Sequence, residues 1–334
     1  SIRKHNIRGY AMRKLLLGTT AIAAAATLTA NAALADVSIS GAYEFYYQSR
    51  SSNQGNTVDG TSTDTDSEIK VTFSNQTDSG LSLSFVSELG TDEGDTPDEA
   101  SLSISGGFGK LVLGENDGVG DNYGIAATDL IAEEAQATGV DSLTLTKADI
   151  AGLGADSPKI AYHLPAMGGL TAGLSHTNSG PAGSSDTTQY GVQYAMDAGG
   201  AAITIGAATG TTENSTQDID SQNMGIKVVS GNISAAVSQA TYEASNTDET
   251  SIGAAVSIKV SDALTFGVHT SETDDDTSSE EYTNSGAEIQ YTIASGLTAV
   301  VGVEDYDYKI GSGSGAGTTA DSGTLSRLTI KASF

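Results

Sequence analysis

The residues best suited to chemistry are carboxylates gathered in one segment, residues 115–157, where Lys147 is the single base. The acids of this segment are Glu115, Asp117, Asp121, Asp129, Glu133, Glu134, Asp141, Asp149 and Asp156. In a narrow, partly dehydrated space such groups attract cations and repel anions, because the effective dielectric constant is lower than in bulk water. In a chain this acidic, a long surface loop that is merely solvated is the plainer alternative for any single residue.

Other reactive constellations are weak. His163, His176 and His269 have no metal-ligand spacing, and no nucleophile elbow or Ser/His/Asp order stands out. The chain has no cysteine, so thiolate chemistry is excluded. Acidic clusters such as 92–95 and 274–276 supply hard oxygens, but none matches an EF-hand loop. We therefore expect no enzyme and no cofactor, and structural Ca²⁺ remains open.

Charge limits the partners. The 334 residues include 15 Lys and Arg against 42 Asp and Glu. Five of the bases and none of the acids precede Asp36, so residues 36–334 carry ten bases and a net charge of −32. Nucleic acid binding needs a basic surface, and we expect no nucleic acid partner. A disordered chain can share this acidity, but it would not keep the alternation described next.

The elements that position the acids are predicted to be strands. Apolar and polar residues alternate along most of the chain, as in the final run, where Leu328, Ile330, Ala332 and Phe334 share one face. The predicted strands lie near 37–48, 67–75, 81–89, 99–105, 109–115, 158–164, 169–177, 187–196, 201–209, 221–229, 232–242, 250–260, 263–271, 282–293, 296–307 and 323–334. Each strand divides an apolar environment from a wet one, as the strands of a transmembrane barrel do.

The connections between these strands alternate in length. Short links such as 230–231 and 294–295 are interleaved with long ones at about 49–66, 90–98, 116–157, 178–186, 210–220, 243–249, 272–281 and 308–322. Outer-membrane barrels have the same asymmetry, with short periplasmic turns and long outer loops. A barrel of about sixteen strands is too wide for its own side chains to fill, so the sequence predicts an aqueous channel.

The N-terminal residues are predicted to direct export. Residues 12–35 have the pattern of a signal peptide, with Arg13 and Lys14 before an apolar stretch and Ala33-Leu34-Ala35 as a cleavage site. We treat residues 1–11 as an upstream extension outside the fold and residues 36–334 as one outer-membrane barrel.

Local runs make the pattern more specific. The run Asp78-Ser79-Gly80-Leu81 and the Gly-Gly-Phe-Gly-Lys-Leu turn that begins at Gly106, followed by one very long loop, resemble the general diffusion porins of Gram-negative bacteria, the alphaproteobacterial type in particular. The resemblance extends over essentially all of residues 36–334. It implies a sixteen-stranded antiparallel barrel in the cell outer membrane, usually a homotrimer, through which small hydrophilic solutes and ions diffuse. Phe334 resembles the terminal signal read by the barrel assembly machinery.

In that family the third long loop folds into the lumen and narrows it, and here this loop corresponds to about 115–157. We predict that the charged side of the constriction is formed by Asp121, Asp129, Glu133, Glu134 and Asp141, and that the wall partners are Lys70 and Arg327. Residues 128–134 are able to form one helical turn, capped by Thr128 or Asp129. The chain departs from the arginine-rich wall of the family, because residues 36–334 contain only Arg50 and Arg327. We therefore expect cation selectivity rather than a strong transverse field.

Two further expectations concern the rims. Lys259 and Lys331 lie near predicted periplasmic strand ends, where pairing with a neighbouring acid is the plainer interpretation. At the acidic outer rim, divalent cations would bridge the protein to anionic lipopolysaccharide.

The alternative function is that of a secreted acidic β-rich surface protein, an adhesin or a calcium-binding protein, which would need two packed sheets.

Overall fold

The computed structural model describes residues 22–23, 36–53, 59–91, 99–131, 157–178, 185–213, 217–311 and 320–334. Of the predicted constriction residues, Glu133, Glu134 and Asp141 lie outside these ranges, as do residues 1–11 and most of the predicted signal peptide. Among the described residues, no helix combines the length and the apolar character needed to span a membrane.

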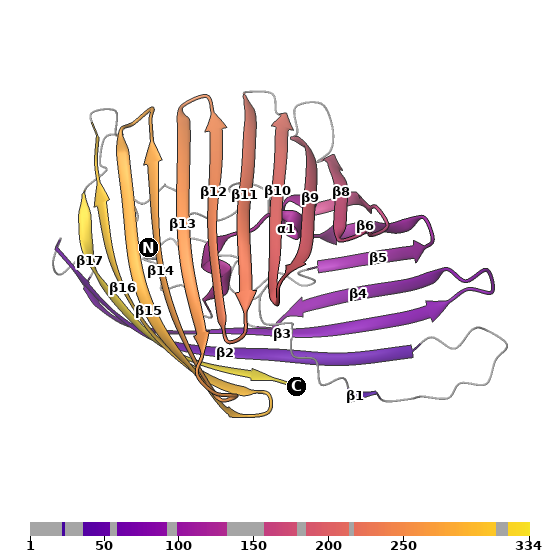
Figure 1. Ribbon diagram of the computed structural model, residues 1–334, viewed down its shortest axis with the longest axis horizontal. Coiled ribbons are helices and arrows are strands. Elements are labelled where there is room, and N and C mark those ends of the chain that lie inside the picture. The colour runs from indigo at the N-terminus through magenta and orange to yellow at the C-terminus, as the bar shows by residue number, and fades with distance from the viewer. Residues whose placement is uncertain are drawn as a thin grey trace.

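Sixteen of the described strands form one closed antiparallel ring (Figure 1). Each strand from β2 to β16 pairs with the next in sequence, and β17 pairs back with β2. The strands are β2 (Asp36–Ser52), β3 (Gly60–Gln76), β4 (Ser82–Gly90), β5 (Glu99–Gly106), β6 (Gly109–Asn116), β7 (Ser157–His163), β8 (Leu170–Asn178), β9 (Asp186–Ala198), β10 (Ala201–Glu213), β11 (Asp218–Ser230), β12 (Ile233–Ala244), β13 (Thr247–Lys259), β14 (Leu264–Asp275), β15 (Glu280–Ala294), β16 (Leu297–Lys309) and β17 (Asp321–Ser333). The two-residue β1 (Ile22–Ala23) pairs with β2. The predicted sixteen-strand antiparallel barrel is confirmed.

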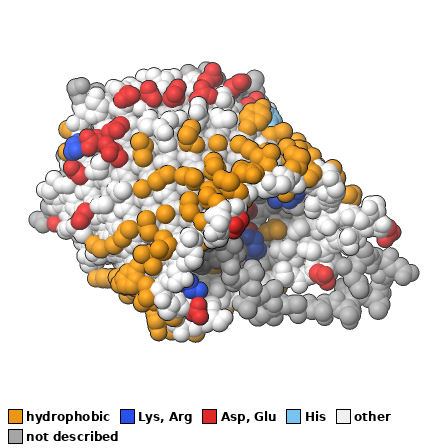
Figure 2. Space-filling model, viewed as in Figure 1, with side chains coloured by type: hydrophobic (Ala, Val, Ile, Leu, Met, Phe, Trp, Pro, Cys, Tyr) orange, Lys and Arg blue, Asp and Glu red, His pale blue; other side chains and the backbone are white. Residues whose placement is uncertain are grey.

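The side chains of the ring are arranged inside out relative to a water-soluble protein. On β13, Ile252 is 57% exposed on the outer face, whereas its neighbour Ser251 is 1% exposed on the inner face. Figure 2 shows the apolar side chains as a broad band across the strands, with acidic side chains along one rim. An aliphatic side chain left in water forgoes about 1.5–3 kcal/mol of burial free energy. The band is therefore stable only against an apolar solvent such as a lipid bilayer.

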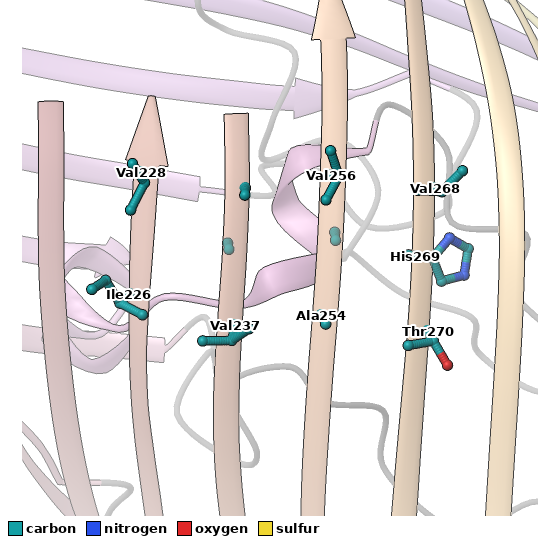
Figure 3. A pocket seen from close by; sticks show the side chains of 11 residues that line it. Ile226, Val228, Val237, Ala254, Val256, Val268, His269 and Thr270 are labelled. Atoms are coloured by element: carbon teal, nitrogen blue, oxygen red, sulfur yellow. The ribbon is translucent and has the colours of Figure 1, made fainter. Parts of the chain in front are cut away.

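The apolar band contains a hollow of about 450 Å³ over the outer side of β11–β14 (Figure 3). The hollow exists because small side chains line it: Ala235 and Ala254 lie among Val237, Val256 and Val268. The hollow belongs to the lipid-facing surface, and the helical ribbon of a segment inside the barrel passes behind the same strands.

The turns at the predicted periplasmic end are tight. Gly231 (φ 57°) and Gly296 (φ 72°) lie in the left-handed region, which favours glycine, and each allows its turn to reverse within two residues. The links between β11 and β12 and between β15 and β16 lie at the opposite end of the barrel from the link between β12 and β13, as the alternation of short and long connections predicted.

Several outer connections are shorter than predicted, because the strands on either side extend further. β2 continues to Ser52 and β3 begins at Gly60, where the sequence predicted a link from 49 to 66. β12 and β13 are joined by Ser245 and Asn246 alone, where a long link from 243 to 249 was expected. Above the membrane both faces of a strand meet water, so polar residues fill both faces. The alternation that reveals a strand then disappears, although the backbone ladder continues.

We predict that a charge on the outer face destabilises the barrel. Val301 on β16 is 54% exposed and lies between Ile289 and Leu328 of the adjacent strands. Val301→Lys should lower the free energy of unfolding by about 2–4 kcal/mol, because the ammonium would lie in lipid. Denaturant titration of the protein in lipid vesicles measures this change.

The matched control is Gln290→Lys on the inner face of β15, which is half-buried and opposite Val300. Its new charge would lie on the polar side of the wall and should change the unfolding free energy by less than about 1 kcal/mol. Equal losses in the two variants would contradict the assignment of the two faces.

Candidate functional site

The segment that follows β6 lies inside the barrel against its wall (Figure 1). It contains a short helix, α1 (Val119–Tyr123), and a 3₁₀ turn, η2 (Ala127–Leu130). The helix α1 contacts β8, β9 and β10, and η2 contacts β11, β12, β13 and β14. The first part of the predicted third loop thus runs across seven neighbouring strands, on the inner side of the wall.

Polar side chains of the wall hold the backbone of this segment. Four backbone N–H groups each donate to an inward side chain: Val119 to Ser175 Oγ (3.2 Å), Gly120 to Gln189 Oε1 (3.0 Å), Ile125 to Asn223 Oδ1 (2.8 Å) and Ala127 to Ser238 Oγ (2.8 Å). Asn223 also donates from Nδ2 to the carbonyl oxygen of Ile125 (3.2 Å). Buried backbone groups need such partners, so the wall supplies what a regular helix or sheet would otherwise provide.

Tyr123 anchors the segment at its centre. Its ring is buried, its hydroxyl lies 2.8 Å from Nδ1 of His163, and it donates to the carbonyl oxygen of Ala172 at 3.1 Å. Burial raises the pKa of the Tyr123 phenol above its ordinary value of 10, because the phenolate would lose its hydration. The hydroxyl therefore remains a hydrogen-bond donor at neutral pH.

The segment has an apolar side against the wall and an acidic side away from it. Val119, Ala126 and Ala127 are at most 1% exposed, whereas Asp121 is half-buried and Asp129 is exposed. Two of the five predicted constriction acids are thus carried by a segment inside the barrel. Glu133, Glu134 and Asp141 are outside the described residues and stay predictions.

The helical content of the segment differs from the sequence prediction. The turn η2 begins at Ala127, one residue before the predicted helical turn, and has no side-chain cap from Thr128 or Asp129. The helix α1 was not predicted, because its five residues are too few for a periodic pattern. Tertiary hydrogen bonds from the wall, rather than local capping, stabilise both pieces.

The predicted wall partners lie on the side of the ring away from α1. Lys70 on β3 forms an ion pair with Glu88 on β4. Arg327 on β17 donates to Oε1 of Gln48 at 3.2 Å, and its guanidinium lies 5.3 Å from the centre of the Tyr46 ring. Both bases therefore have partners on the wall itself, and their pairing with the loop acids stays a prediction.

Two bases near the periplasmic strand ends pair as the sequence predicted. Lys259 lies 3.0 Å from Asp262, and both side chains are exposed. Lys331 lies 3.4 Å from Glu44, and this pair is buried. An exposed pair of the first kind contributes about 1 kcal/mol or less to stability.

Sequence reasoning missed a buried network at the seam between β2 and β17. It placed Arg50 near the outer end of the first strand, where the structure has it, but it did not identify the partners. Nη2 of Arg50 lies 2.7 Å from Asp321 and donates to the hydroxyl of Tyr306 at 2.8 Å, while that hydroxyl donates to Asp321 at 3.0 Å. Arg50 is separated from Tyr306 and Asp321 by more than 250 residues. The only signal in the sequence was that each of the three occupies an inward-facing position on its strand.

A second missed cluster lies across β14, β15 and β16. Nε2 of His269 is 3.3 Å from Oε2 of Glu304, and Asn284 donates to Oε1 of Glu304 at 3.4 Å. Gly286 on β15 lies between His269 on β14 and Glu304 on β16. The His269 imidazole fills the space that a side chain at position 286 would need. The histidine is a polar wall residue, as its isolated position in the sequence indicated.

Acids outnumber bases among the buried charged residues that the structure describes. Nine carboxylates are buried: Glu44, Glu68, Glu88, Glu249, Asp275, Glu280, Glu288, Glu304 and Asp321. Three bases are buried: Arg50, Lys159 and Lys331. Glu44, Glu68 and Glu288 lie beside the outward-facing residues Tyr43, Ile69 and Ile289 and therefore face the lumen, so the inner wall is acidic.

The described residues contain no group of three or more His, Asp or Glu side chains arranged to hold a metal ion. The expectation of structural Ca²⁺ therefore stays a prediction. This arrangement can line an aqueous lumen with charged side chains and narrow that lumen with a loop that is hydrogen-bonded to one side of the wall.

Comparison with known proteins agrees with this geometry. A family model described as Gram-negative porin matches residues 18–311. An anion-selective porin from Comamonas acidovorans has a TM-score of 0.65 and 15% identity, with 90% of this chain and 100% of that chain covered. The trimer form of OmpT, an outer membrane protein of Vibrio cholerae, has a TM-score of 0.66 and 16% identity, with 90% and 99% covered. A mutant porin of Rh. blastica has a TM-score of 0.63 and 15% identity, with 89% and 100% covered.

A search of curated protein sequences gives no match. The structural likenesses have low identity and therefore show the fold alone, and the alphaproteobacterial branch stays a prediction.

We predict that Asn223→Ala loosens the loop from the wall. The substitution leaves both the N–H and the carbonyl oxygen of Ile125 without their partner, at a cost of about 1–3 kcal/mol for buried groups. Hydrogen exchange, followed by mass spectrometry of peptides that cover 119–131, should become faster. Asn284→Ala, which removes a buried amide on β15, beyond the strands that α1 and η2 contact, should leave exchange in this segment unchanged. Equal exchange rates in the two variants would contradict the proposed attachment of the loop to the wall.

Proposed function

The chain belongs to the Gram-negative porin family and forms a barrel in the bacterial outer membrane, and we propose that its channel passes small hydrophilic solutes and ions with a preference for cations. The observation that carries the proposal is the closed sixteen-strand ring with a charged inner wall. Rings of this size leave an aqueous lumen. The alternative of a secreted acidic surface protein is not favoured, because the outer faces of the strands are apolar.

The preference for cations rests on the sign of the lumen charge. Among the described residues, nine buried carboxylates accompany three buried bases, and two of these bases have carboxylate partners, Arg50 with Asp321 and Lys331 with Glu44. Asp121 and Asp129 add negative charge on the loop. Fixed charges close to a narrow path attract counter-ions more strongly than they would in bulk water.

The fold does not by itself decide the sign of selectivity. The porin from Comamonas acidovorans is described as anion-selective and shares the barrel at 15% identity. Selectivity is set by the side chains that line the lumen, and these differ freely between barrels of the same architecture. The supporting argument for this chain is therefore its own charge distribution.

We extend the proposal to the partners of the barrel. A homotrimer is supported by the trimer form of the Vibrio cholerae protein, which has the same fold. Outer-membrane lipids and lipopolysaccharide would contact the apolar band and the acidic rim, and the barrel assembly machinery would insert the protein. The mass of the purified complex, measured by light scattering with a correction for detergent, distinguishes a trimer from a monomer.

We predict that the reversal potential under a KCl gradient indicates preferential passage of K⁺. The preference should decrease with salt, because the screening length falls from about 10 Å at 0.1 M to about 3 Å at 1 M. Planar-bilayer recording of the purified protein measures this reversal potential at each salt concentration. A potential of the opposite sign would contradict the cation preference, whereas the absence of conducting channels would contradict the pore itself.

The loop acids should contribute measurably to this preference. One charge acting at roughly 10 Å through water changes the energy of an ion by about 0.4 kcal/mol, or about twofold in its population. Replacing both Asp121 and Asp129 by Asn should therefore lower the cation population about fourfold and raise the anion population about fourfold, so the ratio of cation to anion permeability should fall by about sixteenfold at low salt. Glu272→Gln removes one charge from the exposed outer face of β14 and should leave the ratio unchanged.

A further inference from the structure

We infer that four glycines of the inner wall set the distance between the third loop and the wall, and with it the free width of the channel. The four are Gly173 on β8, Gly191 on β9, Gly206 on β10 and Gly225 on β11, and together we name them the glycine lane. The inference rests on the proposed function, since it identifies positioning residues for the same channel.

The glycine lane crosses four neighbouring strands beneath α1 and the residues that follow it. Gly173 lies directly opposite Gly191, and Gly206 directly opposite Gly225. Between the two pairs the lane steps by two residues, since Gly191 faces Ala208 and Gly206 faces Gln193. All four glycines therefore lie on the inner face of the wall.

Side chains on the lane would occupy the space that the loop fills. A Cβ atom at Gly173 would lie 2.8 Å from Cε2 of Tyr123, and one at Gly191 would lie 2.7 Å from Cβ of the same residue. A Cβ atom at Gly206 would overlap the carbonyl oxygen of Tyr123. At Gly225 it would lie 2.7 Å from Cβ of Ile125. Real Cβ atoms essentially never approach other heavy atoms within 3.0 Å.

Space, rather than backbone conformation, explains these glycines. None of the four has a φ in the left-handed region. Glycine within a strand costs about 0.5–1 kcal/mol relative to alanine, and it is typical of places where another backbone approaches closely. Four such positions in adjacent strands, all against Tyr123, Val119 or Ile125, form a shallow track for the loop.

An added methyl group should move the loop and not the wall. Each wall strand is hydrogen-bonded to neighbours on both sides, whereas the described part of the loop is held by separate hydrogen bonds to wall side chains. Relief from 2.7 Å to ordinary contact at 3.4 Å needs a shift of roughly 0.7 Å toward the lumen. Such a shift narrows the channel beside the loop.

The chain supplies a matched control on the same inner face. Gly302 on β16 also alternates with exposed neighbours, but among the residues that the structure describes, a Cβ atom there would meet nothing closer than 3.8 Å. Gly302→Ala therefore adds the same methyl group and the same strand propensity away from Val119, Tyr123 and Ile125.

The position of the loop can be measured without current. The chain has no cysteine, so the double variant Ala127→Cys and Ser238→Cys introduces a single pair, at positions where the loop N–H is 2.8 Å from the wall hydroxyl. Under mild oxidation this pair should cross-link in the folded barrel. Adding Gly225→Ala should reduce the cross-linked fraction, and adding Gly302→Ala should not.

Single-channel recording provides the second readout. Gly206→Ala and Gly225→Ala should each give a lower conductance than the parent protein, and Gly302→Ala should retain the parent value. Should Gly206→Ala not fold, Gly173→Ala is the milder change, because its new carbon meets the far edge of the Tyr123 ring rather than a backbone oxygen. Folding is checked by the change in gel migration on boiling.

The outcomes separate the inference from the proposed function. Lane variants that conduct and cross-link like the Gly302→Ala control would overturn the role of the glycine lane and leave the channel intact. If the parent protein does not conduct, the proposed function fails, while the cross-linking comparison still reports whether the lane positions the loop.

Discussion

The closure of the backbone ladder between β17 and β2 is the constraint on which the rest of the structure depends. A strand that crosses lipid has no water to satisfy its N–H and carbonyl groups, so every strand needs a partner on each side. Closure meets that need for the whole ring at once. It also divides each strand into a lipid face and a water face, and this explains why Ile252 is exposed while Ser251 beside it is buried.

Closure creates a lumen that the wall alone does not fill, and the third loop is the element that modifies it. Regular sheets offer no free backbone partners to a loop that lies on them. The wall instead uses Ser175, Gln189, Asn223 and Ser238 as hydrogen-bond acceptors for the loop, and glycines to let it lie close. Strands β11–β14 have small residues on their lipid side, and the hollow of Figure 3 lies over these strands, which contact η2 on the inner side.

Charge on the inner wall is organised in pairs and clusters rather than as isolated groups. Arg50, Tyr306 and Asp321 join β2, β16 and β17 in a buried network. It combines the Arg50–Asp321 ion pair with a hydrogen bond from Arg50 to the Tyr306 hydroxyl and another from that hydroxyl to Asp321. Breaking one partner of such a network leaves a buried charge without compensation and is costly. Buried acids remain in excess after these pairings, and this excess supports the proposed preference for cations.

The sequence by itself determined the barrel. Alternation with period two identified all sixteen strands, because lipid and water impose opposite demands on successive side chains. It located the loop and its acids from length and charge, and it anticipated the pairing of Lys259 and Lys331 with neighbouring acids. It underestimated the outer strand ends, such as Gly60–Asp66 on β3, because polar residues fill both faces where both are wet.

Only the tertiary structure decided where the loop rests and which residues hold it. Tyr123 meets His163 across 40 positions, and Ile125 meets Asn223 across 98. In the sequence, Gly206 and Gly225 are unremarkable glycines within strands, since each gives the same local signal as Gly302 on β16. The difference between them is that Tyr123 or Ile125 of the loop lies against Gly206 and Gly225, whereas among the described residues nothing lies closer than 3.8 Å to a Cβ atom at Gly302. That is a matter of distance between segments remote in the chain, and local propensity carries no information about it.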